Sequence, residues 1–365
     1  MIGAQVVIDG GKTTHTGGGR VMNSIPATMR ALLLRDYDGR PDSISVGEVP
    51  VPRPGPGQVL VRVAASPVNP SDLMFIRGLY GFKKPLPTIP GFEGSGTVVA
   101  AGTGIMPRLL LGRRVACAAA DPSIVGGTWA EYLVTSAKLC IPLRKQVGME
   151  QGATMLINPL TAWGLLEEAR RGNHRAVVQT AAASALGRMV VRLARRFSIA
   201  TINIVRRPEQ VELLRTMGAE HVLNANDSGF DGNLRDLCHA LGASIGFDAV
   251  AGEMSARILR AQPAGSRLLV YGALSQEASR IDPGSLIFER KRVEGFWLSS
   301  WLRSKNMLSQ LRIAGKVQGL LAGDLSTDIQ ARLPLEEAAR GLKQYSAHMT
   351  SGKVLFLPQQ TDSIP

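Results

Sequence analysis

The stretch that decides the fold of this chain is AVVQTAAASALGRMVVRLARRFSIATINIVRR, residues 176–207. It opens with a Val-rich apolar run over Ala176–Gln179 that is too short for a helix, which is typical of a buried parallel strand. Apolar residues then repeat along one helical face, and the members of that face are Leu186, Val190, Leu193, Ala194 and Phe197. A second strand over 201–205 completes a βαβ unit of about 30 residues, the length of a mononucleotide-binding half.

The turn between this strand and helix indicates what the unit could bind. Small residues there let a pyrophosphate approach the backbone, and the first N–H groups of the helix donate hydrogen bonds to it. Of the usual G-x-G-x-x-G fingerprint, Ala181-x-x-Ser184-x-x-Gly187 keeps only the last glycine. The turn alone therefore fits a cofactor site or a plain buried crossover. The cofactor contacts that we expect here are Ala182, Ala183, Ser184, Ala185, Leu186 and Gly187.

The end of the second strand indicates which dinucleotide would bind. A site for NAD places an Asp or Glu there to hold the ribose 2′-hydroxyl. This chain has Arg206 and Arg207 instead, whose forked donors suit a 2′-phosphate. The alternative is two solvated charges in a loop. If the unit holds a cofactor, we therefore expect NADPH.

Length and composition set the outer limits. A chain of 365 residues can form two domains, and no apolar run approaches the length of a membrane span. The cysteines Cys117, Cys140 and Cys238 are far apart, so we expect a reducing, cytoplasmic compartment and no disulfide framework. The net charge of +13 favours anionic partners, such as a phosphate-bearing cofactor or an acyl thioester. Nucleic acid is not expected, because the arginines are spread over predicted helices.

Several segments along the chain give an α/β fold class. Glycine-punctuated polar residues over 1–28 predict a disordered leader or tag remnant, and short strands between Gly and Pro turns follow from Met29. A helical segment that breaks near Pro159 leads into alternating strands and helices. These predict a doubly wound parallel sheet, with a helix over 234–241 and a sixth strand over 293–298. A last strand over 352–356, without a helix-linked partner, is expected to return to the first domain.

Six motifs together are more specific than the glycine turn: Val68–Asp72, Gly78–Gly81, Pro90–Gly94, Asn158–Ala162, Thr201–Arg207 and Gly295–Trp301. Their order resembles the medium-chain dehydrogenase/reductase superfamily, and looks closest to its zinc-free 2-enoyl thioester reductase and quinone oxidoreductase branches. The resemblance implies a GroES-like, β-rich catalytic domain over 29–152 and a Rossmann domain over 153–304. It further implies a return to the catalytic domain over 305–358, a tail over 359–365, and a homodimer that pairs sixth-strand edges.

The same comparison bears on metal binding. Zinc members of the superfamily carry a Cys and a His in the segments where this chain has Ser71 and Phe92. A hydroxyl and a phenyl ring cannot complete a tetrahedral zinc site. The five histidines are scattered, and the closely spaced four-Cys lobe of zinc members is absent. We therefore expect no metal.

The resemblance implies two residues for the chemistry. Tyr80 maps onto a tyrosine whose phenol donates to a thioester carbonyl as charge develops, or delivers a proton after hydride arrives. The alternative is an ordinary loop tyrosine packed on the barrel. Asn69 resembles a residue close to the nicotinamide, and the alternative is an Asn-Pro turn former.

Further residues are implied for cofactor and substrate. Thr161 matches a residue at the nicotinamide end, unless it caps a helix before Ala162. Trp297 and Trp301 follow the sixth strand, where open α/β sheets bind ligands, unless they are core or interface aromatics. Cofactor contacts are also expected at Tyr271, Phe296 and Trp297. Ala185 stands where relatives often have Gly, which could crowd the pyrophosphate.

The expected function is NADPH-dependent reduction of the activated C=C bond of a 2-enoyl thioester carried by coenzyme A or acyl carrier protein. Hydride would reach Cβ and a proton Cα, with Tyr80 assisting at the carbonyl. One alternative is a quinone reductase of the same fold, which needs no acyl pocket. Another is a cofactor-binding protein without useful catalysis.

Overall fold

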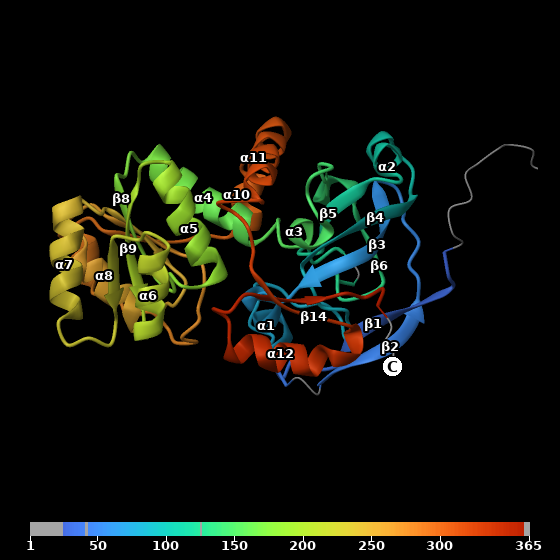
Figure 1. Cartoon of the computed structure of the whole chain (residues 1–365), viewed down its shortest axis with the longest axis horizontal. Helices are drawn as coiled ribbons and strands as arrows, with labels where there is room; N and C mark the ends of the chain where they lie inside the picture. Colours follow the sequence, from blue (N-terminus) through green and yellow to red (C-terminus); the bar gives the residue numbers. More distant parts are fainter. Residues whose placement is uncertain (1–24, 41–42, 125, 361–365) are drawn as a thin grey trace, which may run out of the picture.

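The computed structural model describes residues 25–40, 43–124 and 126–360 (Figure 1). The expected leader over 1–28 lies outside these residues, apart from positions 25–28. Two bodies lie side by side: a parallel sheet flanked by helices, on the left in Figure 1, and a β-rich body on the right. Within the described part of the chain, no helix combines the length and apolarity needed to cross a membrane.

The parallel sheet has six strands in the order β10-β9-β8-β11-β12-β13. Its strands are β8 (Ala176–Gln179), β9 (Ala200–Val205), β10 (His221–Asn224), β11 (Ile245–Asp248), β12 (Arg267–Val270) and β13 (Arg292–Gly295). Every neighbouring pair is parallel. The order reverses between β8 and β11, which is the crevice where doubly wound sheets bind ligands.

Alternating side chains of this sheet bury two different cores. Val177 packs with helices α4 (Asn158–Arg171) and α5 (Ala185–Arg196) on one face. Val178 packs with α7 (Phe230–Leu241) and α8 (Glu253–Ala261) on the other. The two-residue period of a strand sends successive side chains to opposite faces, so both faces are covered. The remaining helices of this half are α6 (Pro208–Thr216), α9 (Pro283–Ile287), α10 (Leu298–Arg303) and α11 (Met307–Leu320).

Three differences from the expected elements exceed a single residue. The sixth strand ends at Gly295, because Trp297 is the N-cap of α10. Helix α7 begins at Phe230, ahead of the expected 234. Pro159 lies in the first turn of α4, where its missing N–H costs nothing. The interruption therefore lies between α3 (Met149–Ala153) and α4.

The β-rich body is built on a seven-stranded sheet. Its path is β14-β15-β3-β4-β5-β7, with β6 on β3, and a separate ribbon pairs β1 with β2. The bounds are β1 (Thr28–Leu34), β2 (Ile44–Pro50), β3 (Gln58–Pro67), β4 (Glu93–Ala101), β5 (Arg114–Ala118), β6 (Tyr132–Ser136), β7 (Cys140–Pro142), β14 (Ile329–Leu333) and β15 (Lys353–Phe356). Two short helices, α1 (Pro70–Ile76) and α2 (Ile105–Leu110), join its strands.

The last described elements of the chain lie in this β-rich body. Strand β15 pairs antiparallel with β3 through Leu355 and Pro67. It also pairs parallel with β14, and α12 (Ala338–Ala347) connects the two. The expectation that the last strand has no helix-linked partner was wrong. The short segment IQARL mixes polar and apolar residues and gives only a weak strand pattern.

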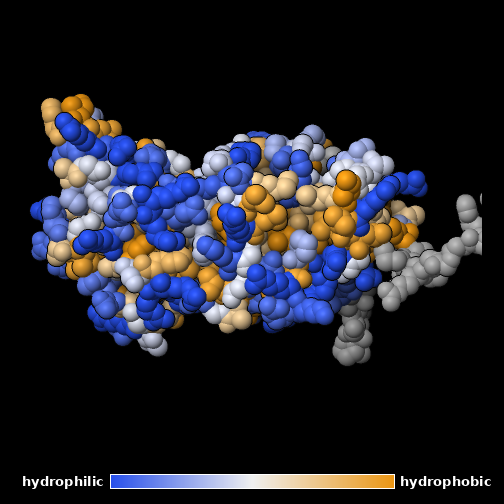
Figure 2. Space-filling view, turned by 90° about the horizontal axis from the view of Figure 1, so that it is seen from above, coloured by the Kyte–Doolittle hydropathy of each residue, from blue (hydrophilic) through white to orange (hydrophobic). Residues whose placement is uncertain are grey.

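Seen from above, one face of the molecule is mostly hydrophilic (Figure 2). Apolar surface gathers on it where α2 and α11 reach the top of the molecule. The exposed side chains there are Ile105, Met106 and Leu109 on α2 and Met307, Leu308 and Leu311 on α11.

Candidate active site at the junction of the two bodies

Tyr80 joins the two halves of the molecule. It lies in the loop after α1, and its hydroxyl accepts a hydrogen bond from the indole Nε1–H of Trp297 at 3.2 Å. Trp297 comes from the parallel-sheet half, at the point where the chain leaves β13 and enters α10. A phenol that was predicted as a proton donor is therefore placed directly where the two halves meet.

An aromatic cluster surrounds this phenol, formed by Tyr80, Phe82, Phe92 and Trp297. The Tyr80 ring lies 4.6 Å from the ring of Phe92 and 5.1 Å from that of Phe82, centroid to centroid. Trp297 remains 41% exposed, so the cluster has one solvent-accessible side. Such a surface can pack against a flat or acyl group and still offer one hydroxyl.

The surroundings of Tyr80 keep its phenol protonated. Burial is the largest cause, and it raises the pKa of Tyr80 above its usual value. The hydrogen bond from Trp297 acts in the opposite direction, and the carboxylate of Asp72 raises the pKa again. The hydroxyl therefore keeps its proton through the physiological pH range and can donate it.

Asn69 is fully buried. It is the N-cap residue of α1, followed by Pro70 at the first helical position. Its Oδ1 accepts from the ammonium of Lys353, and its Nδ2 donates to Glu93 Oε1 at 2.9 Å. Both ends of the amide are thus engaged inside the protein, and a direct contact with substrate or nicotinamide stays a prediction.

Thr161 lies one turn into α4 and is nearly buried. The helix is capped by Ile157, whose carbonyl accepts from the Thr161 N–H at 2.9 Å. Thr161 therefore does not cap the helix. Its place at the start of the helix that follows the β-rich body suits a contact at the nicotinamide end, which stays a prediction.

The turn after β8 combines a left-handed residue, a capping serine and a tightly packed glycine. Ala181 adopts a left-handed backbone with φ of 49°, where glycine is the usual residue. Ser184 caps α5, and its side chain accepts from the Gly187 N–H at 3.1 Å. A Cβ on Gly187 would lie 2.4 Å from the carbonyl oxygen of Ala182, so this position requires glycine. Ala185 is the first residue of α5 and is buried, as are Ala182, Ala183 and Leu186.

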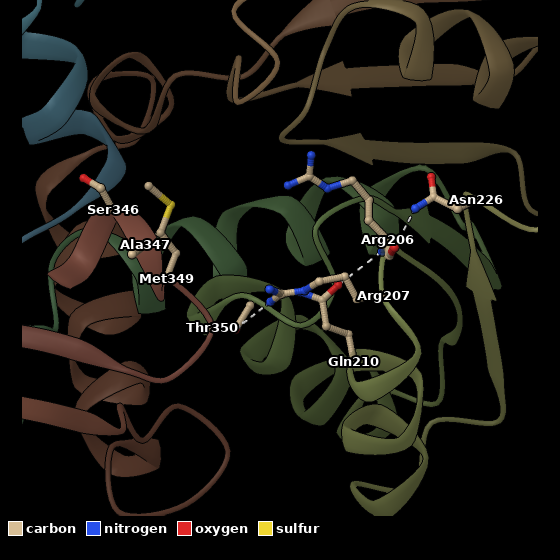
Figure 3. A pocket seen from close by; sticks show the side chains of 8 residues that line it. All are labelled: Arg206, Arg207, Gln210, Asn226, Ser346, Ala347, Met349 and Thr350. Atoms are coloured by element: carbon tan, nitrogen blue, oxygen red, sulfur yellow. Dashed lines mark hydrogen bonds between the residues drawn. The ribbon is translucent and has the colours of Figure 1, made fainter. Parts of the chain in front are cut away.

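A hollow of about 440 Å³ opens at the end of β9. Its lining residues are Arg206, Arg207, Gln210, Asn226, Ser346, Ala347, Met349 and Thr350. Figure 3 shows both arginine side chains extending toward the wall formed by 346–350, which belongs to the β-rich half. Arg207 is held by Glu209 at 3.1 Å and by Thr350 Oγ1 at 3.4 Å. Within the described residues, the Arg206 guanidinium has no hydrogen bond or ion pair, so its donors face the hollow unused.

The two tryptophans predicted for the substrate pocket lie in different surroundings. Trp297 contacts Tyr80, whereas Trp301 is nearly buried in the core formed with α4. The Trp301 indole donates to Glu168 at 3.2 Å, and its ring lies 6.2 Å from that of Phe296. This geometry favours packing for Trp301 and an accessible position for Trp297. Tyr271, which follows β12, packs against the same core.

Side chains that could bind a metal do not cluster in the described residues. Across 25–40, 43–124 and 126–360, no three His, Cys, Asp or Glu side chains lie together in a way that could hold a metal ion. Phe92 belongs to the aromatic cluster, and Ser71 lies in the first turn of α1. The expectation of a metal-free site remains a prediction.

Comparison with known proteins identifies the family. Residues 55–145 match the alcohol dehydrogenase GroES-like domain, and residues 185–312 match the domain described as zinc-binding dehydrogenase. The chain is 33% identical over 286 residues to the mitochondrial enoyl-[acyl-carrier-protein] reductase of Arabidopsis thaliana, covering 75% of this chain and 73% of that protein. The chain belongs to the medium-chain dehydrogenase/reductase superfamily. The predicted membership of this superfamily and the predicted fold class are both confirmed.

Further relatives fix the branch of this superfamily. The human mitochondrial enoyl-[acyl-carrier-protein] reductase is 28% identical over 347 residues, or 91% of this chain and 89% of that protein. A crystal structure of a proposed NADPH:quinone reductase from Mesorhizobium loti is 38% identical, with a TM-score of 0.85 over 92% of this chain and all of that one. A mycobacterial protein complexed with NADPH is 25% identical, with a TM-score of 0.78 over 90% of this chain and all of that one. This medium-chain reductase is therefore an oxidoreductase of the enoyl reductase and quinone oxidoreductase branch.

Some residues of this site could not be found from the sequence pattern. Phe82 packs against Tyr80, but no periodicity marks it as different from a core residue. The wall at Met349 and Thr350 lies more than a hundred positions from Arg207, in a segment without any motif. Lys353 offered one signal, a charged residue inside the apolar run GKVLF.

Proposed function

We propose that this oxidoreductase uses NADPH to reduce the activated C=C bond of a 2-enoyl thioester. The single observation that carries the proposal is the Tyr80 hydroxyl, protonated and held by Trp297 at the junction of the two bodies. A donor at such a junction can stabilise charge on a substrate carbonyl that lies between the bodies. Several relatives are named enoyl-[acyl-carrier-protein] reductases, which supports the same substrate class.

The residues that would hold NADPH suit its chemistry. The Ser184-capped end of α5 offers backbone N–H groups to the pyrophosphate, and Arg206 offers unused donors to the 2′-phosphate. When bound, the cofactor supplies the hydride. The structure of a mycobacterial relative in complex with NADPH supports this choice.

The part assigned to Tyr80 is hydrogen-bond donation to the thioester carbonyl while negative charge develops on its oxygen. The proton can stay on the phenol throughout, or pass to Cα once hydride has reached Cβ. Trp297 orients the hydroxyl by donating to it, which leaves the O–H bond free to point toward the substrate. Phe82 and Phe92 exclude water from the other side of the ring.

A quinone is the second candidate substrate. The aromatic cluster offers flat apolar surface that a quinone ring can stack on, and the phenol can donate to its carbonyl. The Mesorhizobium loti relative supports this alternative by its assignment.

Steady-state NADPH oxidation with crotonyl-CoA and with 1,4-benzoquinone separates the two candidates. The proposal expects a kcat/KM for crotonyl-CoA at least about tenfold above that for the quinone. The reverse ratio would assign the quinone instead. Absence of turnover with both, despite NADPH binding, would leave a cofactor-binding protein without useful catalysis.

We also propose a homodimer formed through β13. This strand is the edge of the parallel sheet, and its unpaired backbone is a template for a second copy. Ile287, Phe288 and Val293 expose apolar side chains beside that edge. A two-fold pairing of identical edges would cover them. The cytoplasmic compartment stays a prediction, and several relatives are named mitochondrial.

A further inference from the structure

A set of buried polar and charged side chains lies next to the aromatic cluster, where Asp72 accepts from the backbone N–H of Phe92. Its members are Asn69, Asp72, Glu93, Tyr345 and Lys353, all buried, and the name buried network is used for them below. They come from four elements: the start of α1, β4, α12 and β15. The ammonium of Lys353 is the centre, because it donates to Asn69 Oδ1, to the carbonyl of Val68 at 3.0 Å and to the Tyr345 hydroxyl at 3.0 Å.

The charges in the buried network do not cancel. Asp72 and Glu93 bring two carboxylates against the one ammonium of Lys353. Burial raises the pKa of Asp72 to about 7, although the Asn69 N–H and Lys353 act to lower it. Burial likewise raises the pKa of Glu93 and lowers that of Lys353, while each of these two groups favours the charged form of the other. Three other titratable groups interact electrostatically with these carboxylates: Tyr80, Cys117 and Tyr345. Burial is the largest cause of the raised pKa of each, and the carboxylates raise it further.

The two carboxylates hold the backbone of two different segments. Asp72 Oδ1 accepts from the N–H of Phe92 at 3.0 Å, and the Phe92 ring packs against Tyr80. Glu93 Oε2 accepts from the N–H groups of Leu156 and Ile157, at 2.8 and 3.0 Å. Ile157 caps α4, the helix that carries Thr161. One carboxylate therefore fixes the backbone behind the proposed donor, and the other fixes the entry to the parallel-sheet half.

We propose that Lys353 is a positioning residue whose buried ammonium favours the ionised forms of Asp72 and Glu93, so that the backbone beside Tyr80 and the backbone at the start of α4 keep their relative positions. The positioning claim rests on the proposed function, whereas the electrostatic claim does not. A protonated carboxyl accepts more weakly from a backbone N–H, so loss of the ammonium loosens both attachments. The link reaches the active site from the far end of the chain, because β15 supplies the charge.

The test uses Lys353→Met, which removes the charge and keeps a side chain of similar length. It leaves Asp72 and Glu93 without a counter-charge, so the pKa values of both rise further. The double variant Lys353→Met/Glu93→Gln restores the net charge of the buried network to −1, the value of wild type with all three groups ionised. Lys343→Met, at an exposed position on α12, is the matched control for the same chemical change.

Melting temperature is measured from pH 6 to pH 8. In Lys353→Met the two carboxyls bind protons more tightly when folded than when unfolded, so stability is lost as pH rises through their folded pKa. We expect its deficit against wild type to be small at pH 6 and to grow by several degrees at pH 8. Lys343→Met should show a deficit that does not change with pH, and the double variant, which has lost one of the two raised carboxyls, should show a smaller pH dependence than Lys353→Met. A Lys353→Met deficit that is equal at both values overturns the electrostatic claim.

Kinetics tests the positioning claim. With the better of crotonyl-CoA and benzoquinone, we expect kcat of Lys353→Met to fall at least about tenfold, with the KM for NADPH within about threefold. The double variant should recover most of kcat, and a double variant no better than Lys353→Met contradicts the proposal. If Lys353→Met does not fold, Tyr345→Phe, which removes one partner of the ammonium, should show the same pH trend with smaller amplitude. If wild type reduces neither acceptor, the proposed function fails, while the melting curves still decide the electrostatic claim.

Discussion

At the scale of single residues, the proposed reduction depends on one phenol. Tyr80 lies in a loop, yet its ring contacts Phe82 and Phe92, and its hydroxyl meets an indole from the other half of the chain. Burial raises its pKa, so the hydroxyl should donate across the whole working range of pH. A donor to a developing oxyanion and a purely packed tyrosine make different kinetic predictions.

Tyr80→Phe should keep NADPH affinity within about twofold and lower kcat by about 10²- to 10³-fold, since one oxyanion donor contributes on this order. Steady-state rates and a fluorescence titration with NADPH check it. Tyr132→Phe, on β6 and away from the cluster, is the control and should change neither quantity. An unchanged kcat in Tyr80→Phe would remove this residue from the chemistry.

Individual residues also mark the limit of sequence reasoning. Arg206 and Arg207 could be selected because strand length and turn position place them at one known edge of the sheet. The pairing of Asn69 with Lys353 could not, because their hydrogen bond joins positions 284 apart. The local sequence Asn-Pro-Ser-Asp does not reveal that both ends of the Asn69 amide are hydrogen-bonded inside the protein.

At the scale of elements, most of the expected cofactor contacts lie at the turn between β8 and α5. Its sequence lost two of the usual glycines, yet Ala181 still takes the left-handed conformation with φ of 49°. Tertiary packing thus imposes a backbone shape that glycine would adopt more freely. Gly187 is kept because its Cα approaches the backbone of Ala182 too closely for any side chain.

Gly187→Ala should therefore lower the free energy of unfolding by about 1–3 kcal/mol, the usual cost of overpacking, and weaken NADPH binding. Gly232→Ala in α7 is the opposite case, because a Cβ there would meet nothing within 4 Å. That substitution should raise stability by about 0.5–1 kcal/mol, since helical alanine loses less entropy than glycine. Urea denaturation of both variants measures the pair. Equal signs for the two would contradict the packing argument.

Elements with strong local patterns were predictable. The bounds of β8 coincide with the Val-rich run because all four residues are buried. The sixth strand was predicted too long, since Phe296 and Leu298 continue its apolar pattern although Trp297 already caps α10. Strand β14 was missed because its residues are mostly half-buried and its register to β15 is irregular.

At the scale of the whole molecule, the sheet edge at β13 makes a prediction about assembly. Phe288 is 83% exposed beside that edge, and a single chain leaves it in water. Light scattering should therefore give twice the chain mass of 39.0 kDa. Phe288→Asp/Val293→Asp should shift the protein to a monomer. Leu308→Asp, in the apolar surface over α11, is the control and should leave the mass unchanged (Figure 2).

The sequence predicted the order of the two bodies along the chain but not the contacts between them. The chain returns through β14, α12 and β15. This return brings Thr350 into a hydrogen bond with Arg207 and Lys353 into one with Asn69. Both contacts need the folded topology, because the partners lie far apart along the chain. The hollow at Arg206 and Arg207 and the buried network are both completed by this last segment.

The central claim is that NADPH binds with its 2′-phosphate against Arg206 and Arg207. Isothermal titration calorimetry of wild type and Arg206→Ala with NADPH and NADH tests it most directly, with Arg235→Ala, exposed on α7, as the control. Wild type should bind NADPH at least about tenfold more tightly than NADH, and Arg206→Ala should lose about 10- to 100-fold for NADPH alone. Equal or tighter binding of NADH by wild type, or binding of neither, would contradict the account.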